Sequence, residues 1–86
     1  MYYVYIIANE KKDTYIGYTS DLEERLKKHN SMDNEGYTKN QKWHYVYYEA
    51  YLSKIDAVLR EKRLKSHGQS KRQLKVRIQQ SIKMRE

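Results

Sequence analysis

Tyrosine dominates the aromatic residues of this chain, which has ten tyrosines, one tryptophan and no phenylalanine in 86 residues. Ordinary packing explains most of these rings, but each phenol also adds a hydrogen-bonding hydroxyl that phenylalanine lacks. Side chains alternate along a strand, so Tyr5 and Tyr15 could converge on one face if residues 2–8 and 14–18 form a hairpin. These two phenols are therefore the first candidates for a shared site.

Gly17 lies on the same strand face as Tyr15 and leaves a notch beside it. A glycine inside a strand often marks a bulge, or a place where another backbone or a ligand comes close. A simple strand end explains it equally well. The sequence leaves both interpretations open.

Arg25 and His29 fall on one stripe of a predicted helix, together with Leu22 and Leu26. The stripe faces the sheet, and an inward arginine needs an anionic partner or a phosphate. Lone arginines among leucines more often extend to the surface, and a lone histidine is more often a hydrogen-bonded polar residue than a catalyst. Neither residue defines a site by itself.

Glu61 lies inside the apolar arc of another predicted helix, between Val58 on one side and Ala57 and Leu64 on the other. Such a carboxylate can pair with a buried arginine, bind a divalent cation through oxygen, or extend outward at the edge of the arc. The residues alone give these three interpretations equal weight.

Hydrophobic patterning predicts the elements that must position these side chains. Runs of β-branched and aromatic residues predict strands, and apolar spacings of three and four predict helices. The predicted strands cover residues 2–8, 14–18 and 43–51, the predicted helices cover residues 21–30 and 54–66 and a last segment from residue 70, and a surface loop covers residues 31–42.

Capping patterns set the predicted helix ends. Ser20 with Glu23 begins the first helix, Ser53 begins the second, Gly68 ends the second, and Ser70 begins the last. The order strand, strand, helix, strand, helix, helix predicts an α/β fold in which helices flank a small three-stranded antiparallel sheet. We expect one domain over residues 1–80, with residues 81–86 forming a frayed tail.

Composition restricts the classes of function. Eighteen Lys and Arg against eleven Asp and Glu give a net charge of +7 and a pI near 9.6, which favour a polyanionic partner such as nucleic acid. Solubility alone is the alternative explanation of a basic surface. Cysteine is absent, which excludes disulfides, thiolate catalysis and cysteine-ligated zinc and favours a cytoplasmic location.

The longest apolar run, Tyr2–Ala8, is shorter than the roughly 18 residues of a membrane span. We therefore expect neither a signal peptide nor a membrane anchor. No pattern in the sequence indicates a small-molecule cofactor, and we expect a monomer.

Two tripeptides resemble the paired motifs that name the GIY-YIG nuclease superfamily: Tyr3-Val4-Tyr5 and, ten residues after Tyr5, Tyr15-Ile16-Gly17. Tyr3 stands where the family name has glycine, as in compact stand-alone members. The resemblance extends over about residues 2–80. It is also carried by Leu22-Glu23-Glu24-Arg25-Leu26, His29-Asn30, Gly36-Tyr37-Thr38, Tyr47-Tyr48-Glu49, and Ala57-Val58-Leu59-Arg60-Glu61-Lys62 with Lys65.

The resemblance implies that Tyr5 and Tyr15 line a catalytic face, that Arg25 contacts the scissile phosphate, and that Glu61 holds one Mg²⁺ or Mn²⁺ ion. His29 is implied as a supporting catalytic residue. The expected contacts to nucleic acid are Gly17, Arg25, Asn30, Lys39, Lys42 and Lys65.

Tyr18 stands where some nucleases of this superfamily carry a lysine, and Lys39 or Lys42 would have to replace that cation. A tyrosine is also a poor base at its ordinary pKa of about 10, so Tyr5 could act as one only if nearby cationic charge favours its ionised form.

The function implied is a metal-dependent endonuclease that hydrolyses phosphodiester bonds, in DNA rather than RNA, with weak sequence specificity or with structure selectivity. The alternative is a non-catalytic, basic nucleic-acid-binding module that retains the fold. A third hypothesis, a protein-interaction adaptor, requires a contiguous exposed aromatic patch.

Overall fold

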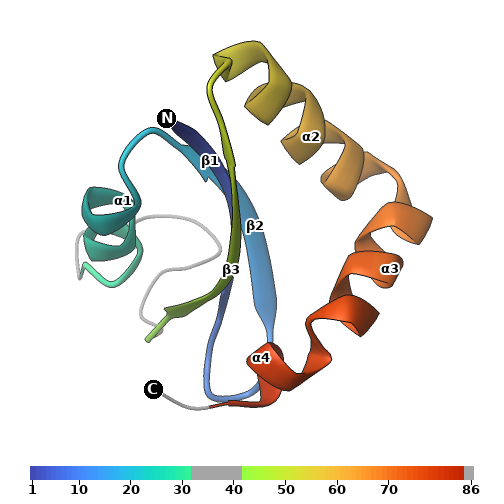
Figure 1. Ribbon diagram of the computed structural model, residues 1–86. Helices are drawn as coiled ribbons and strands as arrows, with labels where there is room; N and C mark the ends of the chain where they lie inside the picture. The colour runs from blue at the N-terminus through green and yellow to red at the C-terminus, as the bar shows by residue number, and fades with distance from the viewer. Residues whose placement is uncertain (32–41, 85–86) are drawn as a thin grey trace.

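The computed structural model describes residues 1–31 and 42–84, which form three strands and four helices (Figure 1). The elements are β1 (Tyr2–Ala8), β2 (Thr14–Thr19), α1 (Leu22–His29), β3 (His44–Tyr51), α2 (Lys54–Ser66), α3 (Gly68–Arg77) and α4 (Gln79–Lys83). No helix in this described part is long and apolar enough to cross a membrane.

The sheet has the strand order β2-β1-β3, and both pairings are antiparallel. The predicted α/β class and three-stranded antiparallel sheet are confirmed. β1 is the central strand, and its residues from Val4 to Ala8 are buried, as expected for a continuous apolar run. The pairing of β1 with β3 shifts register between Ile6 and Ile7.

The turn between β1 and β2 is organised by one asparagine. The side-chain oxygen of Asn9 accepts hydrogen bonds from the backbone N–H groups of Lys11 and Asp13, both at 3.0 Å. Lys12 takes a left-handed conformation with φ of 68°, which the Asn9 contacts on either side stabilise. This turn fixes the register of the hairpin.

Each face of the sheet has its own core. Helices α2, α3 and α4 cover one face and α1 covers the other (Figure 1). The first core contains the buried residues Val4, Ile6, Ile16, Ala57, Leu64, Leu74 and Ile78. The second contains Tyr5, Ile7 and Trp43, with Leu22 and Leu26 packed against them. The sheet therefore separates two helical layers.

The first helix begins one residue later than predicted. Asp21, not Ser20, is the N-cap, and its carboxylate accepts a hydrogen bond from the N–H of Glu24 at 3.1 Å. Aspartate and serine are comparable N-caps, so two adjacent candidates could not be separated by pattern alone. Ser53 precedes α2 as predicted but makes no side-chain cap hydrogen bond.

The C-terminal helices differ most from the prediction. The predicted bounds of the second helix, residues 54–66, are those of α2, and Gly68 follows its C-cap His67. Gly68 is also the first residue of α3, which therefore begins two residues before the predicted start at Ser70. The predicted last helix is also interrupted at Ile78, whose backbone leaves helical geometry, so α3 and α4 are separate. Ile78 is buried in the core at this break.

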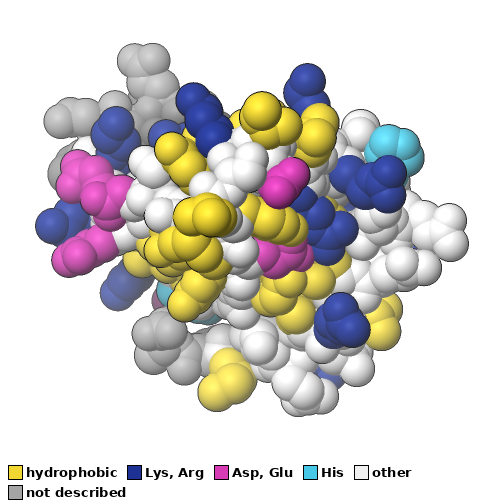
Figure 2. Space-filling model, turned by 45° about the horizontal axis from the view of Figure 1, so that its top comes forward, with side chains coloured by type: hydrophobic (Ala, Val, Ile, Leu, Met, Phe, Trp, Pro, Cys, Tyr) yellow, Lys and Arg dark blue, Asp and Glu magenta, His cyan; other side chains and the backbone are white. Residues whose placement is uncertain are grey.

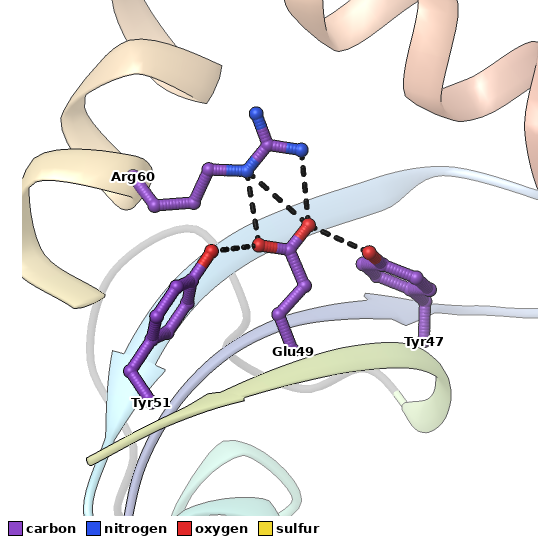
Figure 3. A network of polar contacts seen from close by, with 4 residues as sticks. All are labelled: Tyr47, Glu49, Tyr51 and Arg60. Carbon is purple, nitrogen blue, oxygen red and sulfur yellow. Dashed lines mark hydrogen bonds and ion pairs between the residues drawn. The ribbon is translucent and has the colours of Figure 1, made fainter. Parts of the chain in front are cut away.

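A polar network ties α2 to β3 (Figure 3). The carboxylate of Glu49 accepts hydrogen bonds from the hydroxyls of Tyr47 and Tyr51 and from the Nε and Nη2 atoms of Arg60 at 3.0–3.2 Å. Burial alone would raise the pKa of Glu49, but the Arg60 guanidinium and the two phenols outweigh it and hold that pKa below its usual value. The network therefore anchors α2 to the sheet through Arg60, the residue that precedes Glu61.

We expect Glu49→Gln to lower the free energy of unfolding at pH 7 by about 1–3 kcal/mol, because the amide loses charge-assisted hydrogen bonds. The folded-state pKa of Glu49 lies below its usual 4.5, so the unfolded chain binds the proton first as the pH falls. The stabilisation is therefore complete above about pH 4.5 and is lost at lower pH. Urea unfolding from pH 7 to pH 3 measures this loss, and parallel stability curves for the two proteins would contradict it.

Candidate active site

The hydroxyl of Tyr5 is the centre of the polar cluster between the sheet and α1. It lies 2.7 Å from Nε2 of His29 and accepts a hydrogen bond from Nε of Arg25 at 3.2 Å. The ring of Tyr45 packs edge-on against Tyr5 with centroids 5.4 Å apart. Tyr5 is fully buried, with 0% exposure. Three elements, β1, α1 and β3, therefore meet at one phenol.

Gly17 lies opposite Tyr5 in the hairpin. A Cβ atom at this position would overlap the Tyr5 hydroxyl and ring and would lie 2.9 Å from its Cε2 atom. The strand-end interpretation is therefore wrong: the glycine allows the Tyr5 ring to lie across β2. Gly17 is buried, and the notch it leaves is filled by the protein's own phenol.

Helix α1 presents Arg25 and His29 to the sheet, which confirms the predicted inward stripe. Leu22 and Leu26 from the same face pack against the second core. The partner of Arg25 in the cluster is the Tyr5 hydroxyl rather than a carboxylate, and this hydrogen bond raises the pKa of Arg25. A guanidinium carries five N–H donors, more than this contact uses, so it can also address a phosphate.

The protonation states within the cluster follow from burial and from the charge of Arg25. Burial, helped by Arg25, lowers the pKa of His29, which favours a neutral imidazole at pH 7. Burial raises the pKa of Tyr5 although Arg25 opposes the rise, so the phenol keeps its proton. Because Arg25 can only donate, we assign the Tyr5 proton to the hydrogen bond with Nε2 of His29.

Tyr15 extends this cluster to the edge of the sheet. Its ring lies edge-on to His29, with centroids 5.3 Å apart, and the ammonium of Lys65 lies 5.4 Å from the Tyr15 ring centroid. Tyr15 packs with the α1-side core, whereas Lys65 belongs to α2 on the other side. Since β2 is an edge strand, Lys65 reaches Tyr15 past this edge.

Glu61 approaches the cluster from α2 and is half-buried. It forms an ion pair with Lys65 at 3.3 Å, so its partner is this lysine rather than the buried arginine considered from sequence. Its negative charge contributes to the raised pKa of Tyr5, which places the two groups within electrostatic range. The structure thus brings Tyr5, Tyr15, Arg25 and His29 into one cluster, and Glu61 joins it through Lys65, which lies beside Tyr15.

The remaining predicted contact residues lie away from this cluster or outside the described residues. The amide of Asn30 accepts from the backbone N–H of Trp43 at 2.7 Å and donates to its carbonyl at 3.0 Å, a positioning role. Lys42 is exposed, and Lys39 lies outside the described residues. The sequence analysis missed Tyr45, whose hydroxyl donates to the carbonyl of Leu22, because ten tyrosines carry no signal that separates this one.

One carboxylate is available for a metal ion in this cluster. Among the described residues, no group of three or more His, Cys, Asp or Glu side chains is arranged to bind a metal. Mg²⁺ usually keeps several waters and binds through one or two carboxylates plus substrate phosphates. A single half-buried carboxylate such as Glu61 fits this requirement.

The surface around the site is divided by charge and polarity. Figure 2 shows acidic side chains gathered over the α1 side and hydrophobic side chains across the middle of the same face. The exposed hydrophobic residues include Leu52, Ile55 and Leu59, at the start of α2 and just before it. Single exposed apolar residues are common on soluble proteins, so these do not define an aromatic interaction patch.

The fold and the tyrosine, arginine and glutamate cluster together define a catalytic domain of the GIY-YIG class. Residues 1–75 match the family described as the GIY-YIG catalytic domain, and the chain belongs to this family. A UPF0213 protein of Haloquadratum walsbyi is 33% identical over 73 residues, 84% of this chain and 82% of that protein. A UPF0213 protein of Staphylococcus aureus strain Mu3 is 35% identical over 72 residues, 83% of this chain and 88% of that protein. No solved structure matches significantly.

The close approach of Tyr5 to Gly17 gives a test with a matched control. Gly17→Ala should lower the free energy of unfolding by about 1–3 kcal/mol, because the added methyl group forces the Tyr5 ring to move. Gly68→Ala meets nothing within 4 Å at the start of α3 and should be neutral or stabilising by up to about 1 kcal/mol. Thermal unfolding measures both effects. Equal shifts in the unfolding temperature of the two variants would contradict the close approach of Tyr5 to Gly17.

Proposed function

We propose that this protein is a divalent-metal-dependent endonuclease that hydrolyses phosphodiester bonds in nucleic acid. The observation that supports this most is the Tyr5 hydroxyl, held between the Arg25 guanidinium and the His29 imidazole. Members of the GIY-YIG family are typically nucleases, and their substrate is nucleic acid.

The proton path follows the hydrogen bonds. A water molecule attacks phosphorus and gives its proton to the Tyr5 oxygen, while the phenol passes its own proton to Nε2 of His29. A bond forms between the water oxygen and phosphorus, and the bond to the leaving oxygen breaks. That oxygen takes up a proton from solvent water, and His29 afterwards returns to solvent the proton it accepted. Tyr5 therefore needs no prior ionisation, which removes the difficulty of using a phenol as a base at neutral pH.

Arg25 stabilises charge during this step. Its guanidinium can move from the phenol to the phosphoryl oxygens, where negative charge develops. The Arg25 contact, at 3.2 Å, is longer than the 2.7 Å contact to His29. Because Tyr5 is fully buried, this displacement also gives the attacking water access to the phenol oxygen. Binding of the substrate phosphate by Arg25 would then expose the Tyr5 hydroxyl at the same time.

Glu61 would hold the metal ion, which when bound polarises the phosphate and neutralises the leaving oxygen. Lys65 pairs with Glu61 at 3.3 Å, so it must release the carboxylate when the ion binds. The ammonium then remains beside Tyr15 and can contact a phosphate. Either Mg²⁺ or Mn²⁺ suits a site with one carboxylate oxygen donor and bound water.

The substrate we propose is DNA in preference to RNA. Recognition would depend on the shape of the DNA or on a strand end, because backbone contacts carry no sequence information. The protein would act as a cytoplasmic monomer. A second candidate, a non-catalytic nucleic-acid-binding module, is favoured by two observations: the complete burial of Tyr5 and the occupation of Glu61 by Lys65.

Removing the Tyr5 hydroxyl should abolish cleavage and leave the fold intact. Tyr5→Phe keeps the ring over Gly17 but ends the proton path, so we expect a fall of about 10²–10⁴-fold in the cleavage rate. Single-turnover cleavage of a labelled branched DNA measures this, with Tyr2→Phe, which packs in the core on the opposite face of the sheet, as the control. Equal rates for both variants would exclude Tyr5 as the base.

Binding and cleavage should separate at Arg25 and Glu61. Arg25→Ala should weaken both, because it removes a phosphate contact, whereas Glu61→Ala should abolish metal-dependent nicking of supercoiled plasmid and leave binding unchanged or tighter. Glu10→Ala, an exposed carboxylate in the β1–β2 turn, is the matched control. Salt-sensitive binding without any nicking by the wild-type protein would instead support the non-catalytic module.

A further inference from the structure

The positive charge of the chain is concentrated in its C-terminal helices. Residues 62–84 contain eight Lys and Arg residues and no Asp or Glu, whereas the rest of the chain contains ten basic and eleven acidic residues. The basic segment comprises the end of α2 and all of α3 and α4, which lie together on one side of the sheet (Figure 1). The field that attracts a polyanion therefore originates on this side.

Two hollows follow this surface away from Tyr15. The first, of about 330 Å³, lies along the β2 edge, and the second, of about 400 Å³, lies along α3. Lys71 lines both hollows, and we call the two together the lysine groove. The residues that line the lysine groove include Thr14, Tyr15, Lys65, Lys71, Arg72 and Lys75.

The walls of the lysine groove are suited to an anion. Among the described residues, no Asp or Glu lines either hollow, and four cationic side chains do. Burial, together with the charge of Lys71, lowers the pKa of Lys75. These two ammonium groups therefore repel one another, and a phosphate between them would relieve the repulsion.

The groove begins at the catalytic cluster. Tyr15 lines the first hollow and packs against His29, which in turn contacts the Tyr5 hydroxyl. Lys65 lines the same hollow and pairs with Glu61. A strand whose phosphate is at Arg25 and Glu61 would have its neighbouring phosphates close to the mouth of this groove.

We infer that the lysine groove binds the phosphodiester backbone of the nucleic acid next to the scissile phosphate, with Lys71 and Lys75 each contacting a phosphate. The inference rests on the proposed function, which it deepens by naming the path of the substrate. It explains how a small domain holds its substrate by backbone contacts alone, without reading bases.

The test is the salt dependence of binding, measured without metal so that cleavage does not interfere. The double variant Lys71→Gln/Lys75→Gln is compared with Lys11→Gln/Lys54→Gln, which removes the same charge from exposed positions outside the groove. Fluorescence anisotropy of a labelled DNA duplex gives the slope of log K against log salt. Each phosphate contact contributes about −0.9 to this slope. The loss of two contacts should therefore make the slope less negative by about 2 in Lys71→Gln/Lys75→Gln, whereas the slope of the control variant should not change.

Lys71→Gln alone provides a second variant, which should make the slope less negative by about 1. Equal slopes for the groove and control variants would overturn the inference, because charge alone would then explain binding. Wild-type cleavage with unaltered binding by the groove variants would overturn it and leave the nuclease proposal standing. Selective loss of binding in a protein that never cleaves would support the groove and end the nuclease proposal.

Discussion

The placement of the Tyr5 ring constrains the rest of the structure. The ring lies over Gly17, and its hydroxyl contacts side chains from α1. This geometry requires a glycine opposite Tyr5 in the hairpin, a central position for β1, and an α1 docked with its Arg25 and His29 face inward. A buried phenol needs hydrogen-bond partners, because an unsatisfied hydroxyl costs about 1–3 kcal/mol. Stability and candidate chemistry thus depend on the same contacts.

One side chain of the α2 layer reaches the opposite face of the sheet at the β2 edge, where Lys65 lies beside Tyr15. The layer of α2 is held by the carboxylate of Glu49 and the guanidinium of Arg60, on the face away from Tyr5. Glu61 follows Arg60 directly, so the anchor that fixes the helix also fixes the direction of the candidate metal ligand. Because β2 is short and at the edge, side chains from α2 reach the α1-side cluster without crossing the sheet. A wider sheet would keep these groups apart.

Composition and periodicity predicted the three strands and the first two helices to within a residue or two, because the sheet is built from dense β-branched and aromatic runs. They predicted one helix where the chain forms α3 and α4. They also placed Arg25 on the helix stripe that faces the sheet, but left open whether its side chain extends to the surface. They could not choose between Ser20 and Asp21 as the cap, or show that Gly68 begins a helix, because each choice depends on tertiary contacts. The pairing of Tyr5 with Gly17 depends on register, which the turn at Asn9 sets through hydrogen bonds that have no periodic signature.

The contact between Asn30 and Trp43 joins the end of α1 to the start of β3 through two hydrogen bonds to one backbone residue. Trp43 is itself buried against Tyr5 and Ile7. The same two hydrogen bonds therefore join the end of the helix that carries Arg25 and His29 to the core that surrounds the Tyr5 ring, so a change at Asn30 would disturb the cluster without touching any of its polar groups.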